Sequence, residues 1–179
     1  MRPVDFLAGK ILGNTIVGFL ATLLILGGGA ISLATTGLAS DIELDYGLVA
    51  VLLVGEILGL LFFGSLYAAA GSMVQRTEDL QSTQAPILFL VFATMYVPMF
   101  GWMHLDATWM QVMTWLPPVS MLVAPMQVAG GNLSWLGLAA SYLLMALVTA
   151  LIIVIVGRIY RRAILNNGRK MTWRQALGK

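Results

Sequence analysis

The chain has 179 residues, of which 59% are hydrophobic and only 10% are charged, and its formal net charge is +2. Soluble domains carry about 25% charged residues, and a chain this short cannot bury so much apolar surface in a water-soluble core. Composition therefore argues against a soluble globular enzyme and a disordered chain, and the absence of cysteine excludes a disulfide framework and thiolate metal sites.

Four long apolar stretches predict membrane-spanning helices, at residues 11–33, 48–74, 85–102 and 135–157. A bilayer core about 30 Å thick needs about 20 apolar residues in a helix, and each stretch approaches or exceeds this length. The third stretch opens with Pro86, which suits the first turn of a helix. The sequence thus predicts an all-α integral membrane protein with a single membrane domain over residues 1–179, and the lipid bilayer as its environment.

Residues 1–10 form a short charged segment directly before the first span. A helix lying at the inner membrane surface fits this mixture of polar and apolar residues and could dock into a soluble partner. The alternatives are a plain flank of the first span, or a signal peptide that includes the first apolar run. That run is longer than the 7–15 residues of a signal peptide core, and Asp5 precedes it, so we expect it to remain as a span.

A fifth apolar stretch, residues 109–129, is interrupted by Pro117, Pro118 and Pro125. Proline breaks or kinks a helix, so a straight span is not expected here. We interpret this stretch as a re-entrant hairpin whose two short helical arms dip into the membrane and return. A kinked fifth span is the alternative.

The distribution of lysine and arginine predicts that both termini are cytoplasmic. Residues 1–10, 75–84 and 158–179 hold all ten basic residues, whereas residues 34–47 and 103–134 hold none. Cytoplasmic loops carry this excess of positive charge in membrane proteins, so no nucleic-acid partner is inferred from the basic balance. A fifth span would put the basic tail outside. We expect the last helix to continue into the tail, to end at Asn166-Asn167-Gly168, and to be followed by either an interfacial helix or a frayed end.

Glu56 is the one ionisable residue well inside a predicted span. It lies about nine residues, or roughly 13 Å, from the outer end of its helix, where a charged side chain costs about 2.5–3.5 kcal/mol on insertion scales. Three explanations are open: a polar substrate path, a structural hydrogen bond, or surface exposure through a shifted helix. We take Glu56 as the candidate residue of a substrate path.

Small residues recur along the second span at a spacing that favours close helix packing. They suggest a contact with another helix or with a second copy of the chain, and they are Gly55, Gly59, Gly64, Ala68 and Gly71.

Catalytic and cofactor motifs are missing. His104 stands without neighbouring metal ligands, and the glycine pair of Gly13–Gly18 is followed by Phe19 where a phosphate loop needs lysine. We therefore expect no catalytic residue, no metal site and no ATP bound by this chain.

Several segments together resemble the type-2 ABC export permeases, in particular the NatB-like sodium-extrusion permeases. They follow one another in order over nearly the whole chain: Arg2-Pro3, Leu7–Gly13, Gly64–Ser72, Thr77–Gln81, Pro86, Trp115–Pro118, Pro125-Met126, Ile159–Leu165 and Gly168–Lys170.

The resemblance implies a permease that works with a separate or fused ATPase, which binds the ATP. It implies that residues 1–10 are a cytoplasmic coupling elbow, with Arg2, Asp5 and Lys10 as candidates for contact with the ATPase. It also implies that residues 115–128 are the external re-entrant hairpin before the last span. Members of that family have six spans, and the first two and their external loop have no counterpart here.

We thus expect the permease part of an ABC exporter of a bacterial or archaeal plasma membrane, not itself an enzyme. It would move an ion such as sodium, or a small molecule or drug, out of the cell. A second permease copy or partner half would complete the path. The alternatives are a non-transporting membrane scaffold or assembly protein, an intramembrane enzyme, and an inert truncated product.

Overall fold

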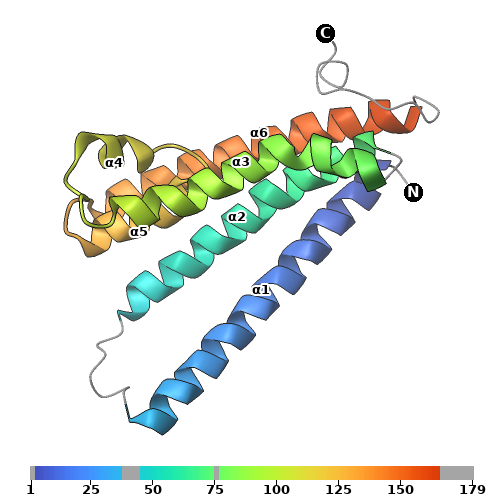
Figure 1. Ribbon diagram of the computed structural model, residues 1–179. Helices are drawn as coiled ribbons and strands as arrows, with labels where there is room; N and C mark the ends of the chain where they lie inside the picture. Colours follow the sequence, from blue (N-terminus) through green and yellow to red (C-terminus); the bar gives the residue numbers. More distant parts are fainter. Residues whose placement is uncertain (1–2, 38–44, 75–76, 166–179) are drawn as a thin grey trace.

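The computed structural model describes residues 3–37, 45–74 and 77–165, and every regular element within these ranges is an α-helix. α1 spans Pro3–Thr36, α2 spans Tyr46–Met73 and α3 spans Thr77–Gly101 (Figure 1). Two short helices follow, α4 at Thr108–Met113 and α5 at Ser120–Ala129, and the long α6 runs over Trp135–Leu165.

Four of these helices are long and apolar enough to cross a membrane, which confirms the predicted all-helical fold with four spans. Their candidate membrane segments are Ala8–Thr36, Tyr46–Met73, Gln81–Gly101 and Trp135–Arg158. The start of α1 and the ends of α2 and α6 lie at one end of the molecule, with α4 and α5 at the other (Figure 1). This arrangement is the one expected when four consecutive helices run alternately in opposite directions. Which end faces the cytoplasm stays a prediction.

α3 begins earlier than the apolar pattern suggested. It starts at Thr77 and encloses both Pro86 and Pro98, so the expectation that Pro86 stands in the first turn was wrong. Polar residues 77–84 extend the helix by two turns beyond the apolar segment. Proline lacks the N–H that a helix interior uses, but spanning helices tolerate it where neighbouring groups satisfy the freed backbone.

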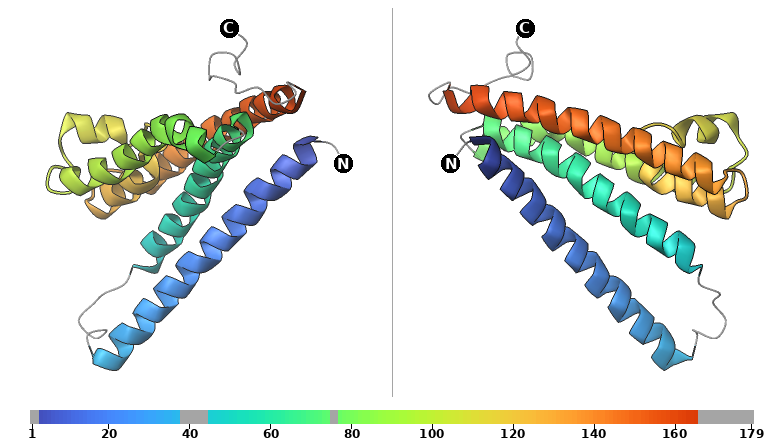
Figure 2. Two further views of the ribbon diagram at one scale, coloured as in Figure 1. Left: turned by 45° about the vertical axis from the view of Figure 1, so that its right-hand side comes forward. Right: turned by 180° about the vertical axis from the view of Figure 1, so that it is seen from behind.

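α2 is the central helix of the molecule, and it contacts α1, α3, α5 and α6. Where α1 meets α2 and α6, Ile11, Ala69 and Val156 form a buried apolar cluster. Farther along, α1 diverges from the other helices, as Figure 1 and the right-hand view of Figure 2 show. Leu24 and Ile25 on this diverging part are 77% and 74% exposed. α1 is therefore packed near its beginning and unpacked near its end.

The predicted elbow at residues 1–10 does not form an element of its own in the described residues. Pro3–Lys10 continues without a break into the rest of α1, and Met1 and Arg2 lie outside the described residues. At the other end, α6 continues to Leu165, directly before the predicted stop at Asn166. The tail 166–179 lies outside the described residues.

The proline-rich stretch contains two short helices, α4 and α5, rather than one span. The peptide bond between Pro117 and Pro118 is cis and lies in the connection between them, while Pro125 lies inside α5. α5 packs against both α2 and α6. The side-chain amide of Gln127 donates to the Leu105 carbonyl at 2.9 Å and so ties α5 to the loop between α3 and α4. How deeply this hairpin enters a membrane stays a prediction.

Candidate transport cavity

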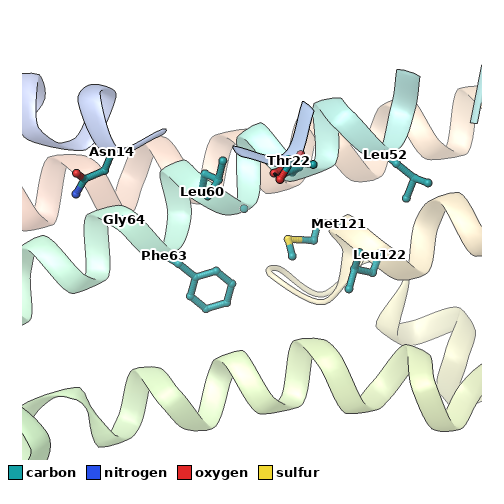
Figure 3. Close-up of a pocket in the computed structure, with 10 residues that line it drawn as sticks. Asn14, Thr22, Leu52, Leu60, Phe63, Gly64, Met121 and Leu122 are labelled. Carbon is teal, nitrogen blue, oxygen red and sulfur yellow. Dashed lines mark hydrogen bonds between the residues drawn. The ribbon is translucent and has the colours of Figure 1, made fainter. Parts of the chain in front are cut away.

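A cavity of about 480 Å³ lies among α1, α2 and α5. Figure 3 shows its lining residues, which come from all three helices. Most of the walls are apolar, and three side chains bring polar groups. The lining residues are Asn14 and Thr22 from α1; Leu52, Glu56, Gly59, Leu60, Phe63 and Gly64 from α2; and Met121 and Leu122 from α5.

Glu56 is the one ionisable side chain among the lining residues, and it is half-buried. The hydroxyl of Thr22 donates a hydrogen bond to its Oε1 atom and so connects α1 to α2 across the cavity. Each carboxylate oxygen can accept two hydrogen bonds, so the carboxylate keeps most of its accepting capacity. The geometry is compatible both with a structural hydrogen bond and with a binding group in a path.

The lining residues of α2 share one face of that helix. Glu56, Leu60 and Phe63 are four and seven residues apart, a spacing that brings side chains onto one side. On α1, Asn14 and Thr22 are eight residues apart, which separates them by roughly 12 Å along the helix axis. Glu56 and Thr22 thus form one polar centre, and Asn14 lies apart from it near Gly64 (Figure 3).

The predicted stripe of small residues on α2 serves different contacts along its length. A Cβ atom on Gly55 would overlap the Tyr142 hydroxyl and the Met121 carbonyl, and one on Gly59 would overlap the Met121 sulfur. Ala68 packs on the Ile11 cluster. Gly64 and Gly71 have open space at the corresponding position. Of the four glycines in the stripe, Gly55 and Gly59 are the ones at which an added Cβ atom would overlap a neighbouring helix.

Tyr142 of α6 is a residue of this region that the sequence analysis did not single out. Its hydroxyl lies 3.1 Å from the Val51 carbonyl of α2 and 3.0 Å from the Met121 carbonyl of α5. A buried tyrosine hydroxyl needs a polar partner, so a tyrosine within an otherwise apolar span was the available signal. Tyr142 joins three helices and fixes the α5 wall of the cavity.

Comparison with known proteins places the chain in a family. Residues 1–158 match the family described as ABC-2 family transporter protein. The chain belongs to the ABC-2 transporter family. ABC-2 permeases are membrane components of transporters and not themselves enzymes, and with the four apolar helices this membership indicates an integral protein of a plasma membrane.

A distant relative of the chain is YhaP of Bacillus subtilis (strain 168), an uncharacterised protein. It is 26% identical over 184 residues, which cover 97% of this chain and 44% of YhaP. The chain thus spans less than half the length of this curated relative. No solved structure matches the chain.

The other residues that the sequence analysis singled out, for contact with the ATPase and for the hairpin, do not line the cavity. Lys10 is exposed near the beginning of α1. Asp5 belongs to the first turns of α1, but its side chain is outside the described set, as is the whole of Arg2. Pro117, Pro118 and Pro125 lie in the hairpin, and His104 is exposed in the loop before it. In the described ranges, no group of three or more acidic, histidine or cysteine residues could hold a metal ion.

Proposed function

We propose that the chain is a permease subunit of an ATP-driven ABC exporter, working with an ATPase subunit and moving an ion such as sodium or a small molecule out of the cell. The family supports the general role, because its members normally work with an ATPase. The cavity at Glu56 is the observation that carries the proposal for a path, because it provides a polar centre inside the span. The chain binds no ATP itself in this scheme.

The position of α1 suggests how ATP would act on the cavity. α1 supplies one wall of the cavity, and its beginning, with Lys10, lies at the end that we assign to the cytoplasm. An ATPase that contacts Arg2, Asp5 and Lys10 differently in its ATP-bound state would favour one tilt of α1 over another. ATP shifts the permease between two arrangements only through such a difference in contact energy.

A second permease copy or a partner half completes the path in this proposal. α1 has no described partner along its outer part, where Leu24 and Ile25 are exposed. The cavity among α1, α2 and α5 is bounded by these three helices and is open beside them.

Co-expression with the ATPase subunit of the same transport system tests the role as a permease. We expect the ATPase to co-purify with the chain, and the combined variant Asp5→Ala with Lys10→Ala to reduce the recovered ATPase. A scaffold that transports nothing would give no such complex. Charge loss at Asp106→Asn, in the exposed loop before the hairpin, serves as the control and leaves the complex intact.

Substitution of the polar centre tests the path. We expect Glu56→Gln to lower ATP-driven uptake of radioactive sodium or tetraphenylphosphonium into inverted vesicles by roughly tenfold or more, the equivalent of about 1.4 kcal/mol, at unchanged expression. Asp106→Asn removes the same charge outside the cavity and keeps full uptake. Full activity of Glu56→Gln would remove this carboxylate from the mechanism.

Orientation is tested by labelling single cysteines in a chain that has none of its own. We expect His104→Cys to react with a membrane-impermeant maleimide from outside the cell, and Lys10→Cys to react only after the membrane is opened. Reaction of both from one side would overturn the proposed threading and, with it, the exporter assignment.

A further inference from the structure

We propose that the cavity among α1, α2 and α5 binds a lipophilic organic cation, with its positive charge at Glu56 and its apolar groups against Leu60, Phe63 and Met121. This inference rests on the proposed function, because it names the substrate class for the same cavity. It is carried by the size of the cavity, the placement of its oxygen atoms and the order of its lining along α2.

The cavity is too large for an inorganic ion alone. Its volume of about 480 Å³ lies within the range of about 300–1,000 Å³ that is typical of sites for drug-sized molecules. A water molecule has a share of about 30 Å³ in the liquid, so a single small ion with a few waters fills only a minor part of this space.

The oxygen atoms of the lining do not surround one point. A cation that loses its hydration shell needs several oxygens converging on it. Glu56 and Thr22 lie together, and Thr22 already uses its proton on the carboxylate. The third polar side chain, Asn14, lies roughly 12 Å away from Thr22 along α1. The lining therefore offers one carboxylate centre and no cage for a bare metal ion.

The charge of the lining selects a cation over an anion. None of the ten lining residues is basic, so an ionised Glu56 has no protein counter-charge among them. Carboxylates inside spans pair with other charges or line substrate paths, because an isolated charge there is costly. A positively charged guest supplies that counter-charge without a hydration shell of its own.

The apolar lining continues from the carboxylate in one direction. Phe63 lies seven residues after Glu56, two turns or roughly 10 Å along the same face of α2. Figure 3 shows its ring extending into the space that Met121 faces from α5. Aromatic rings attract cations over their faces, and methionine adapts to irregular apolar groups. A guest with its charge at Glu56 thus places its apolar body between Phe63 and Met121.

Two ions of one shape and opposite charge test this inference on the purified chain in detergent. Equilibrium dialysis measures binding of tetraphenylphosphonium, a cation, and of tetraphenylborate, the matching anion. We expect the cation to bind at least tenfold more tightly. We also expect Glu56→Gln to weaken binding of the cation by tenfold or more, and to leave binding of the anion unchanged or slightly tighter.

A second pair of variants fills the cavity without touching the carboxylate. A side chain at Gly64, which lines the cavity, meets no atom within 4 Å at its Cβ position, and the same holds for Gly71 outside the cavity. The leucine side chain of Gly64→Leu therefore extends into free space in the cavity and should weaken binding of both ions. Gly71→Leu on the same helix should weaken binding of neither. Unchanged cation binding in Gly64→Leu would overturn the placement of the guest.

Two other outcomes would overturn the substrate class. Equal binding of the two ions, insensitive to Glu56→Gln, would mean a general apolar pocket that admits lipid. Displacement of the cation by sodium chloride at concentrations at which lithium chloride has no effect would mean a sodium site. Because the assay uses no ATPase, loss of cation binding alone refutes the class of substrate, whereas failure to bind the ATPase alone refutes the exporter role.

Discussion

α6 and α1 are both long apolar helices, yet they are held in very different ways. In the most apolar segment of α6, 28% of residues are buried by the rest of the chain, and in that of α1 none is. α6 contacts α2 and α5 and contributes Tyr142 to a three-helix junction. α1 has the Ile11 cluster, the approach of Leu60 to Gly18 and the hydrogen bond of Thr22 to Glu56.

This difference shows that hydropathy alone does not tell a packed span from an unpacked one. Between spans in lipid, apolar surface provides little driving force, since lipid tails are as apolar as leucine. Close approach at small residues and hydrogen bonds between helices decide the packing instead. α2, α5 and α6 have both features, and α1 has them only up to Thr22. The cavity lies where the packed group meets the loosely held helix.

The largest effect is expected at the close approach of α2. Gly55→Ala places a methyl group against the Tyr142 hydroxyl and the Met121 carbonyl, and the backbone carbonyl cannot rotate away. We expect a loss of about 1–3 kcal/mol in the free energy of unfolding, as for other overpacked sites. Thermal unfolding in detergent measures it. Gly71→Ala is the control, because there is open space at its Cβ position. An equal loss of stability there would show that the close approach at Gly55 does not cause the effect.

A smaller effect is expected when only the hydrogen bond of the junction is removed. Tyr142→Phe keeps the ring and deletes the hydroxyl, so we expect a loss of about 1 kcal/mol, the usual net value of one hydrogen bond. Chemical unfolding in mixed micelles gives the difference from the wild type. A variant as stable as the wild type would mean that shape alone holds α5 against α2.

The smallest effect is expected on the outer part of α1. Leu24→Ala removes a side chain that is 77% exposed, and we expect a change below about 0.5 kcal/mol. The matched variant Leu138→Ala on α6, where the side chain is 5% exposed and packs on Ala124 and Tyr142, should lose at least about 1 kcal/mol. Equal losses in the two variants would show that α1 is as firmly packed as α6.

The four spans were predictable because their length follows from the thickness of a bilayer and their composition from its interior. The position of Glu56 deep in the second span could likewise be read from the sequence, although its role stays a prediction. The hydrogen-bond partners of Glu56 and Tyr142 could not be predicted from the sequence. Thr22 meets Glu56 across 34 positions, and Tyr142 meets Val51 across 91, so both contacts depend on how the helices pack.

The start of α3 was missed for a different reason. Hydropathy marks the part of a helix that fits a membrane, and it does not register the polar turns that continue the same helix beyond it. Residues 77–84 are of this kind, and they place Pro86 in the helix interior. The proline pattern at 109–129 did predict two short helices, because proline acts on the backbone itself and depends little on distant contacts.

The Tyr142 hydroxyl has a consequence for relative movement of the hairpin and α2. One hydroxyl carries one proton, yet two carbonyl oxygens lie at nearly equal distances from it, Val51 at 3.1 Å and Met121 at 3.0 Å. A small shift of α5 relative to α2 therefore lets the hydroxyl rotate its O–H from one carbonyl to the other, so the donor stays hydrogen-bonded. The junction thus holds the three helices together through one hydroxyl that has an acceptor on each of two neighbouring helices.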